Sequence, residues 1–162
     1  MRFQIIVLCF ICHTLLAGCS MLSAPSLIKS QDYRVNFGDS LWSEINSDQS
    51  DQAWQSSKSG SIILANSFCK RYQGSSLKSL SSNLLTGVRI LNIIREESLM
   101  SHGREAYEIE ALTSIDGVDM IIFSRTLRKD FCTYDFVLTS NPSVYSQDRN
   151  DFIRFLESVV IK

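Results

Sequence analysis

The chain has 162 residues and a formal net charge of −1, from 16 basic and 17 acidic side chains. This length suits one ordinary domain that can bury a core. Acidic and basic side chains are interspersed along the sequence, and no strongly basic stretch occurs. The composition therefore excludes a nucleic-acid-binding protein that relies on a basic face, and we expect no nucleic-acid partner.

The N-terminal segment has the three-part layout of a secretory signal. Arg2 supplies a positive charge, a mostly apolar run extends from Phe3 to Leu16, and small residues precede Cys19. A transmembrane helix needs about 20 apolar residues, and polar side chains interrupt this shorter run. The segment therefore predicts export.

The residues Leu16-Ala17-Gly18-Cys19 resemble the lipobox of bacterial lipoproteins. In a lipobox the cysteine receives a thioether-linked diacylglycerol, becomes the first mature residue and is then N-acylated, as with palmitate. The resemblance implies a signal peptide over residues 1–18 and attachment to the membrane through lipid on Cys19. A plain cleaved signal and an uncleaved anchor are the alternatives. Inner-membrane lipoproteins commonly carry Asp after the cysteine, and Ser20 stands here instead, which favours the outer membrane, facing the periplasm.

Removal of residues 1–18 takes away Arg2 and leaves 15 basic against 17 acidic side chains, a net charge of about −2. Residues 19–32 are rich in Ser, contain Pro25 and show no sustained period, so we predict a flexible tether. Residues 33–162 are predicted to form a single globular domain.

The mature domain keeps one pair of cysteines, Cys69 and Cys132. An even number in an oxidising periplasm favours a disulfide. Such a bond would close a loop of about 60 residues and stabilise the fold by roughly 4 kcal/mol on the chain-entropy model. Two buried free thiols, or a reactive or metal-binding pair, are the alternatives.

The first predicted element of the domain is a short strand from Tyr33 to Phe37, in which apolar and polar residues alternate. Residues 42–58 are dominated by Ser, Asp and Gln, and we predict an ordered loop pinned by Trp42 and Trp54. A second strand is predicted over residues 61–69, where apolar residues cluster.

A helix is predicted next, with Ser75 or Ser76 as the N-cap and Gly87 marking its end. Leu77, Leu80 and Leu84 form its apolar stripe. Ser81 falls within that stripe, and we expect its hydroxyl to bond to the backbone carbonyl of Leu77.

The remaining sequence predicts an antiparallel meander followed by a helix. The predicted strands cover residues 88–94, 103–113, 118–128 and 131–140, and Asp116-Gly117 is a strong hairpin signal between two of them. Residues 146–160 place apolar side chains on one face of a closing amphipathic helix. The fold class is therefore α+β, with a single twisted antiparallel sheet covered by two helices.

The order of these elements resembles the PsbP-like α/β/α sandwich found in several bacterial lipoproteins. The resemblance is one of layout over about residues 33–160, and it includes Trp54, Ser67-Phe68-Cys69 at a strand end, Gly103-Arg104-Glu105-Ala106 opening a strand and Asp116-Gly117 turning it. That fold hosts adaptors and assembly factors, so any functional transfer is an analogy.

The candidates for chemistry are few, because the sequence has no Gly-x-Ser-x-Gly elbow and no phosphate-binding glycine loop. His102 is the only histidine of the mature chain, and we expect a surface side chain and no metal site. Glu108 and Glu110 are two apart on one strand and could act as paired carboxylates. A solvated sheet face is the other interpretation, with Arg104, Arg125 and Arg128 as the available cross-strand partners.

These features predict no cofactor and a non-enzymatic envelope lipoprotein that binds or helps assemble another envelope protein. We take Trp42 and Trp54, with the loop between them, as the candidate contact surface, and packing of both indoles into the core as the alternative. A periplasmic small-ligand or lipid carrier, with a large apolar cavity inside the sandwich, is an alternative function. A hydrolase or transferase using His102 or Glu108 and Glu110 is another.

Overall fold

The computed structural model describes residues 27–162, so the predicted signal, Cys19 and most of the predicted tether lie outside the described residues. Within this range the elements are, in chain order, β1 (Tyr33–Val35), β2 (Trp42–Ile45), β3 (Gln52–Ser56), β4 (Ile62–Cys69), α2 (Leu77–Asn83), β5 (Arg89–Ser101), β6 (Arg104–Ile115), β7 (Val118–Lys129), β8 (Cys132–Ser140), α3 (Tyr145–Ser158) and β9 (Val159–Ile161).

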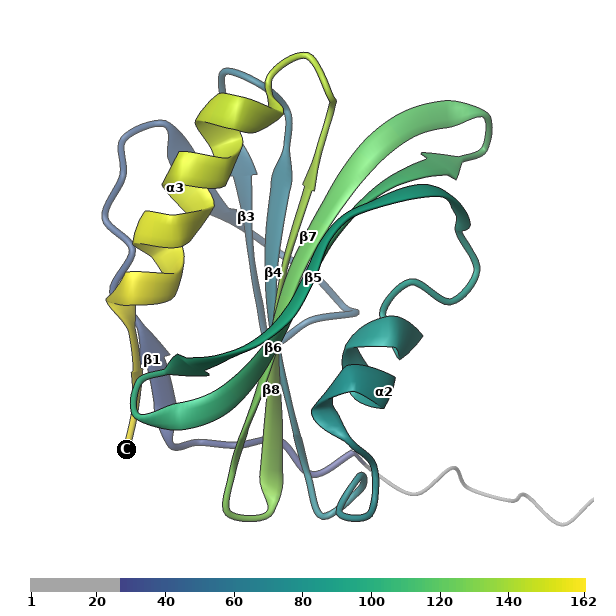
Figure 1. The fold of residues 1–162 in the computed structure, drawn as a ribbon. Coiled ribbons are helices and arrows are strands. Elements are labelled where there is room, and N and C mark those ends of the chain that lie inside the picture. Colours follow the sequence, from purple (N-terminus) through teal and green to yellow (C-terminus); the bar gives the residue numbers. More distant parts are fainter. Residues whose placement is uncertain (1–26) are drawn as a thin grey trace, which may run out of the picture.

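The described strands form a seven-stranded antiparallel sheet in the order β2-β3-β4-β8-β7-β6-β5, and a separate two-stranded ribbon of β1 and β9. The sheet is strongly twisted and lies between the two helices, with α3 on one face and α2 on the other (Figure 1). This arrangement confirms the predicted α+β sandwich. In the part of the chain that the structure describes, no helix is long and apolar enough to cross a membrane.

The larger core fills the space between the sheet and α3. Phe152 and Phe155 project from the helix and meet Phe123 at 4.9 Å and Trp54 at 5.0 Å, measured between ring centroids, in edge-to-face geometry. Edge-to-face aromatic pairs add to the stabilisation that burial itself provides. These four rings fix α3 against the middle of the sheet.

A smaller apolar cluster lies on the opposite face, beneath α2, where Leu85 packs against Tyr107 and Ile109. The helix begins after Ser76, whose side chain accepts a hydrogen bond from the backbone N–H of Ser79, as the sequence predicts. The expected bond of Ser81 is wrong, because its hydroxyl donates to the carbonyl of Tyr107 at 3.4 Å and so joins the helix to the sheet.

The predicted loop over residues 42–58 is wrong, since it contains β2 and β3, which pair as an antiparallel hairpin. Trp42 and Trp54 are each only 5% exposed and belong to the larger core. The indole N–H of Trp42 donates to the carboxylate of Asp151 on α3 at 3.0 Å. Their proposed role as an exposed contact surface is therefore also wrong, and the alternative of core packing holds.

Residues 27–32, predicted as the end of the tether, contact the sheet. Ile28 forms an isolated antiparallel bridge with Cys69, and the backbone N–H of Ser30 donates to the hydroxyl of Ser67 at 2.8 Å. The packed part of the chain therefore begins before Tyr33.

The predicted disulfide is present. Cys69 and Cys132 are opposite each other in the register of β4 and β8, and a disulfide joins them with their Cα atoms 4.0 Å apart. Because Cys69 also forms the β-bridge with Ile28, the disulfide links the segment at Ile28 to β8 through β4.

Candidate functional site

His102 lies at the tight turn between β5 and β6, where its backbone takes a φ of 51°. The side chain is exposed, and its Nε2 lies 3.0 Å from the carbonyl oxygen of Leu156 at the end of α3. In this arrangement the imidazole donates a hydrogen bond that closes the turn against the helix. Among residues 27–162, no group of three or more His, Cys, Asp or Glu side chains is placed to hold a metal ion.

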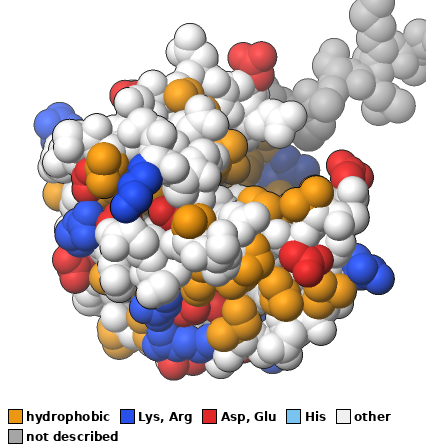
Figure 2. Space-filling view, turned by 90° about the horizontal axis from the view of Figure 1, so that it is seen from above, with side chains coloured by type: hydrophobic (Ala, Val, Ile, Leu, Met, Phe, Trp, Pro, Cys, Tyr) orange, Lys and Arg blue, Asp and Glu red, His pale blue; other side chains and the backbone are white. Residues whose placement is uncertain are grey.

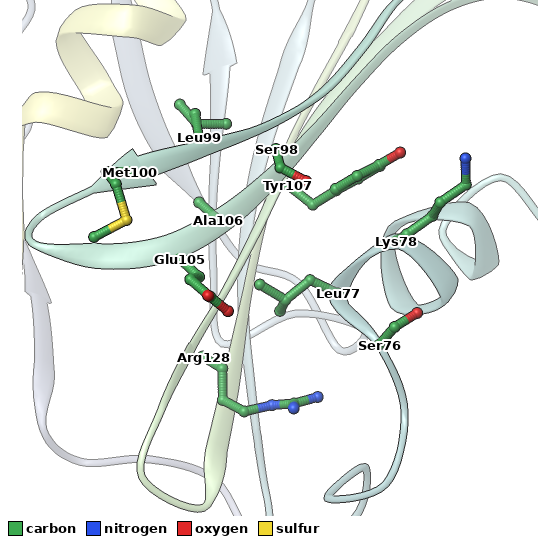
Figure 3. Close-up of a pocket in the computed structure, with 10 residues that line it drawn as sticks. All are labelled: Ser76, Leu77, Lys78, Ser98, Leu99, Met100, Glu105, Ala106, Tyr107 and Arg128. Atoms are coloured by element: carbon green, nitrogen blue, oxygen red, sulfur yellow. The ribbon is translucent and has the colours of Figure 1, made fainter.

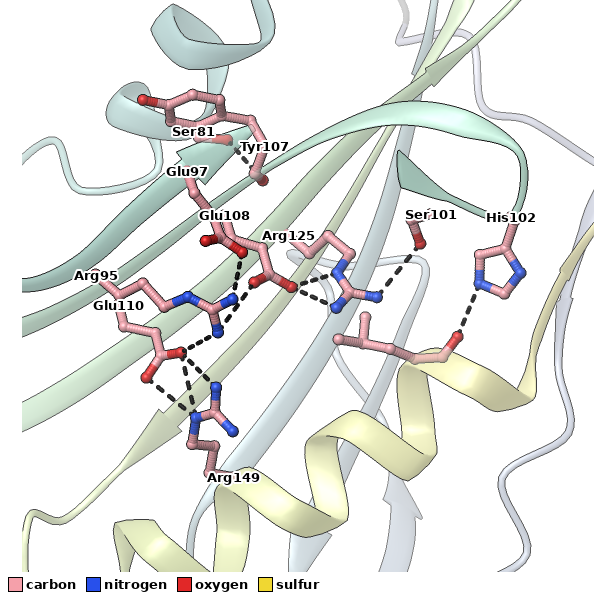
Figure 4. A network of polar contacts seen from close by, with 11 residues as sticks. Ser81, Arg95, Glu97, Ser101, His102, Tyr107, Glu108, Glu110, Arg125 and Arg149 are labelled. Carbon is pink, nitrogen blue, oxygen red and sulfur yellow. Dashed lines mark hydrogen bonds and ion pairs between the residues drawn. The ribbon is translucent and has the colours of Figure 1, made fainter. Parts of the chain in front are cut away.

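Glu108 and Glu110 point to the same side of β6, toward α3, because side chains two residues apart share a face of a strand. They are only 1% and 3% exposed. The predicted solvated sheet face is therefore wrong, and the two carboxylates lie beneath the long side chains of three arginines (Figure 4).

Each carboxylate has its own arginine. The Nε–H of Arg125, on β7, donates to Oε1 of Glu108 at 2.6 Å. The guanidinium of Arg149, on α3, reaches Oε1 of Glu110 at 2.9 Å. Arg95, on β5, bridges the two, at 3.8 Å from Glu108 and 3.6 Å from Glu110.

The ionised state of this cluster follows from its contacts. Burial raises the pKa of Glu110, but hydrogen bonds from Arg149 and Tyr145 outweigh it, so the pKa lies below the usual range. Burial and the hydrogen bond to Glu110 raise the pKa of the Tyr145 hydroxyl. An ionised carboxylate that already accepts these bonds is a poor proton acceptor, and here it joins β6 to α3.

Of the three cross-strand partners that the sequence offers, only Arg125 contacts either glutamate, and it pairs with Glu108. Arg104 donates to the backbone carbonyl of His102, and Arg128 donates to the carbonyls of Tyr72 and Ser75 in the loop before α2. The sequence did not single out Arg95 and Arg149. Arg95 lies opposite Glu110 on the neighbouring strand β5, and Arg149 reaches the cluster from the last helix.

A pocket of about 750 Å³ opens between α2 and the β5–β6 hairpin (Figure 3). Leu77 and Met100 line it together with the ring of Tyr107, whose hydroxyl donates to Glu96 at 2.7 Å. Charged side chains, among them Arg128, also line the pocket, so it is mixed in character. It lies outside the aromatic core and is not the large apolar interior cavity that a carrier would need.

The outer edge of β5 carries an exposed apolar surface. Ile90, Leu91, Ile93 and Ile94, which we call the β5 edge patch, are each between 41% and 47% exposed. Within residues 27–162 no strand pairs with the outer side of β5. Figure 2 views the molecule from the end that carries the β6–β7 turn, and shows hydrophobic side chains gathered on one side.

The local backbone explains why this patch is exposed on both faces. The pairing of β5 with β6 shifts between Ile90 and Asn92 and again between Ile93 and Arg95, so one extra residue bulges at each point. Bulges increase the twist of a strand and turn its side chains away from the sheet. The sequence predicted a strand here from the same apolar residues, but gave no signal that they face solvent.

Comparison with solved structures shows the fold. The solution structure of cyanobacterial PsbP (CyanoP) from Synechocystis sp. PCC 6803 aligns with a TM-score of 0.59 and 10% identity, over 91% of this chain and 99% of its own. LpqN of Mycobacterium tuberculosis, described as involved in cell envelope biogenesis, aligns with a TM-score of 0.58 and 9% identity, over 87% of each chain.

A third structure, the protein of unknown function PA94 from Pseudomonas aeruginosa, aligns with a TM-score of 0.54 and 10% identity, over 86% of this chain and 89% of its own. No protein-family profile and no curated protein sequence matches the chain. The PsbP-like sandwich that the element order predicts is therefore confirmed as a fold. Identities this low carry no residue across from the similar structures.

Proposed function

We propose that this protein is a lipid-anchored, non-enzymatic binding module of the bacterial envelope, attached through Cys19 to the outer membrane and facing the periplasm. The observation that carries the binding role is the β5 edge patch, with four large apolar side chains on a long edge that no strand of residues 27–162 covers. Natural proteins usually blunt such edges with charge, proline, a β-bulge or a covering element. Over residues 90–94 this edge has two bulges but no charged side chain and no proline. An edge left apolar is suited to receive another chain.

The partner that fits this edge is a protein segment in extended conformation. An added strand would satisfy the free backbone groups of β5, while its apolar side chains would cover the patch. Arg89 is exposed at the start of β5, so an acidic residue in the partner segment would complement it. The proposed occupant is thus an apolar strand with an acidic flank.

The side chains that an enzyme would use have structural partners in this fold, which supports a non-enzymatic role. Glu108 and Glu110 are held by arginines, and His102 is held by the carbonyl of Leu156. The envelope location is supported by the lipobox resemblance and by the fold shared with LpqN, which is described as involved in cell envelope biogenesis.

The binding role can be tested with a photo-crosslinking residue at Asn92, which is exposed within the patch, in cells that make the protein. We expect one dominant adduct, with the crosslinked peptide in an extended apolar segment of the partner. Ile93→Lys should abolish it. Val160→Lys, at a similarly exposed apolar position on β9, should leave it unchanged.

Three outcomes would contradict parts of this proposal. An adduct of twice the chain mass would replace the foreign partner with a second copy. No adduct, or one that survives Ile93→Lys, would refute the binding edge. An intact mass without added acyl groups on a chain that begins at Cys19 would refute the anchor.

A further inference from the structure

The end of the sheet where the described chain begins has an unusual surface. The backbone N–H of Cys69 donates to the carbonyl of Ile28 at 2.9 Å, and the backbone N–H of Lys70 donates to the carbonyl of Phe131 at 2.7 Å. These bonds bring three segments together, and we call residues 27–28, 70–71 and 129–131 the anchor-side end. It lies opposite the β6–β7 turn (Figure 1).

Large apolar side chains of the anchor-side end face solvent. Phe131 is 66% exposed at the tip of the β7–β8 turn, Ile28 is 51% exposed and Leu27 is 46% exposed. The larger core already contains the rings of α3 and the central strands, so the phenyl ring of Phe131 adds nothing to it. An exposed phenylalanine at a hairpin tip is well placed to enter an apolar environment outside the protein.

Basic side chains surround these apolar groups. Lys70 and Arg71 are exposed, Lys129 is half-buried, and Asp130 is the only acidic residue of the anchor-side end. Across the described residues, the ion pairs involve other cations and none of these three. This end is therefore positive, although the whole chain has a net charge of −1.

The chain between the predicted lipid and the fold is short. Seven residues lie between Cys19 and Leu27, and these eight Cα–Cα steps can span at most about 30 Å when fully extended. The 12 residues of β7, which run from the β6–β7 turn to the anchor-side end, cover about 40 Å. A lipid on Cys19 would thus hold the anchor-side end, and not the far end, near the bilayer.

From this combination we infer that the anchor-side end rests on an anionic phospholipid surface, with the side chain of Phe131 inserted among the lipids. The inference rests on the proposed anchor at Cys19 and adds an orientation to it. Apolar side chains flanked by Lys and Arg bind at the boundary between headgroups and acyl chains, and the cations are attracted to anionic lipids. The occupant is a bilayer surface, not a soluble anion.

Quenching of an introduced indole by brominated acyl chains tests this orientation. Phe131→Trp is compared with Val118→Trp, at an exposed apolar position on the opposite end of β7. The acylated protein is reconstituted in vesicles of phosphatidylethanolamine and phosphatidylglycerol. Because the chain already has two tryptophans, both buried in the core, complete quenching of the added indole removes about one third of the emission.

We expect the loss of about one third of the emission for Phe131→Trp and almost no loss for Val118→Trp. Lys70→Glu, combined with Phe131→Trp, should reduce the loss by about half, because the cations favour the anionic surface. The matched change Lys58→Glu, at the other end of β4, should not. Equal quenching of the two indoles, or none for Phe131→Trp, would overturn the inference.

A second arm separates this inference from the proposed anchor. A chain that starts at Ser20 and carries no lipid keeps every contact described above, since all of them lie within residues 27–162. With excess vesicles, this unlipidated chain should again show more quenching for Phe131→Trp than for Val118→Trp, although a smaller fraction of it is bound. The intact mass of the full protein tests only whether Cys19 is acylated. An acylated protein without preferential quenching refutes the orientation, and an unacylated one that retains the order refutes only the anchor.

Discussion

Glu108→Gln distinguishes a structural role of the buried carboxylates from a catalytic one. The change removes one negative charge and leaves the side chain nearly the same size. Glu108 is 1% exposed, and its main partner Arg125 retains only 14% of its side-chain exposure. The substitution would therefore leave a nearly buried guanidinium without its counter-charge.

The size of the effect follows from that burial. Breaking a buried ion pair by removing one partner costs about 3–5 kcal/mol. The introduced amide still accepts a hydrogen bond from Arg125, so we expect the lower end, about 3 kcal/mol, or roughly 10 °C in Tm for a domain of this size. Arg95, 3.8 Å from Glu108, is itself a cation and cannot replace the lost negative charge.

Urea denaturation followed by circular dichroism measures the loss. Glu105→Gln is the matched control, because Glu105 is an exposed glutamate on the same strand, and it should shift the free energy of unfolding by less than about 0.5 kcal/mol. The double change Glu108→Gln with Arg125→Gln should cost less than the sum of its parts. Equal stability of the Glu108→Gln and Glu105→Gln proteins would refute the structural role.

Three further changes test other parts of the fold. Replacing Cys69 and Cys132 with Ser, 63 residues apart, should lower the free energy of unfolding by roughly 4 kcal/mol and make it insensitive to reductant. Burial raises the pKa of Asp135 to about 6, so its contribution to stability is present below about pH 4 and lost as the pH rises through about 6. Asp135→Asn should remove about 3 kcal/mol of this pH dependence, which is measured as Tm against pH. Trp42→Phe loses the bond to Asp151 and should cost about 1–2 kcal/mol in urea, whereas a cost near zero would show the bond to be unimportant.

The sequence predicted best where side-chain period and turn chemistry agree. The helix start at Ser76, the Asp116-Gly117 hairpin and the strands around it are local patterns, and each appears close to its predicted place. The helix itself ends at Asn83, before the predicted end at Gly87. Asp116 and Gly117 both have positive φ, as such a turn requires. The pairing of Cys69 with Cys132 followed from counting the cysteines left after export.

The wrong predictions for the tryptophans and the glutamates share one cause. The polarity of a segment does not show which other parts of the chain pack against it. The residues around Trp42 and Trp54 are polar enough to suggest a loop, yet the two indoles fill the core from the edge strand β2 and its neighbour β3. Glu108 and Glu110 alternate with apolar residues as a solvated face would, but arginines on the two neighbouring strands and on α3 cover them. The alternation of apolar and polar residues alone cannot distinguish a strand face exposed to solvent from one whose charged side chains form buried ion pairs.

The two proposed surfaces lie at opposite ends of the same strands. Ile90 in the β5 edge patch pairs with Thr113, which pairs in turn with Met120 near the start of β7, whereas Phe131 follows the end of β7. A domain that rests on lipid through Phe131 would hold the patch about 30–37 Å from that residue, given about 3.4 Å per residue of β7. The arginine cluster joins β5, β6, β7 and α3 between these ends. Lipid attachment and partner capture would then occur at the same time without competing for surface.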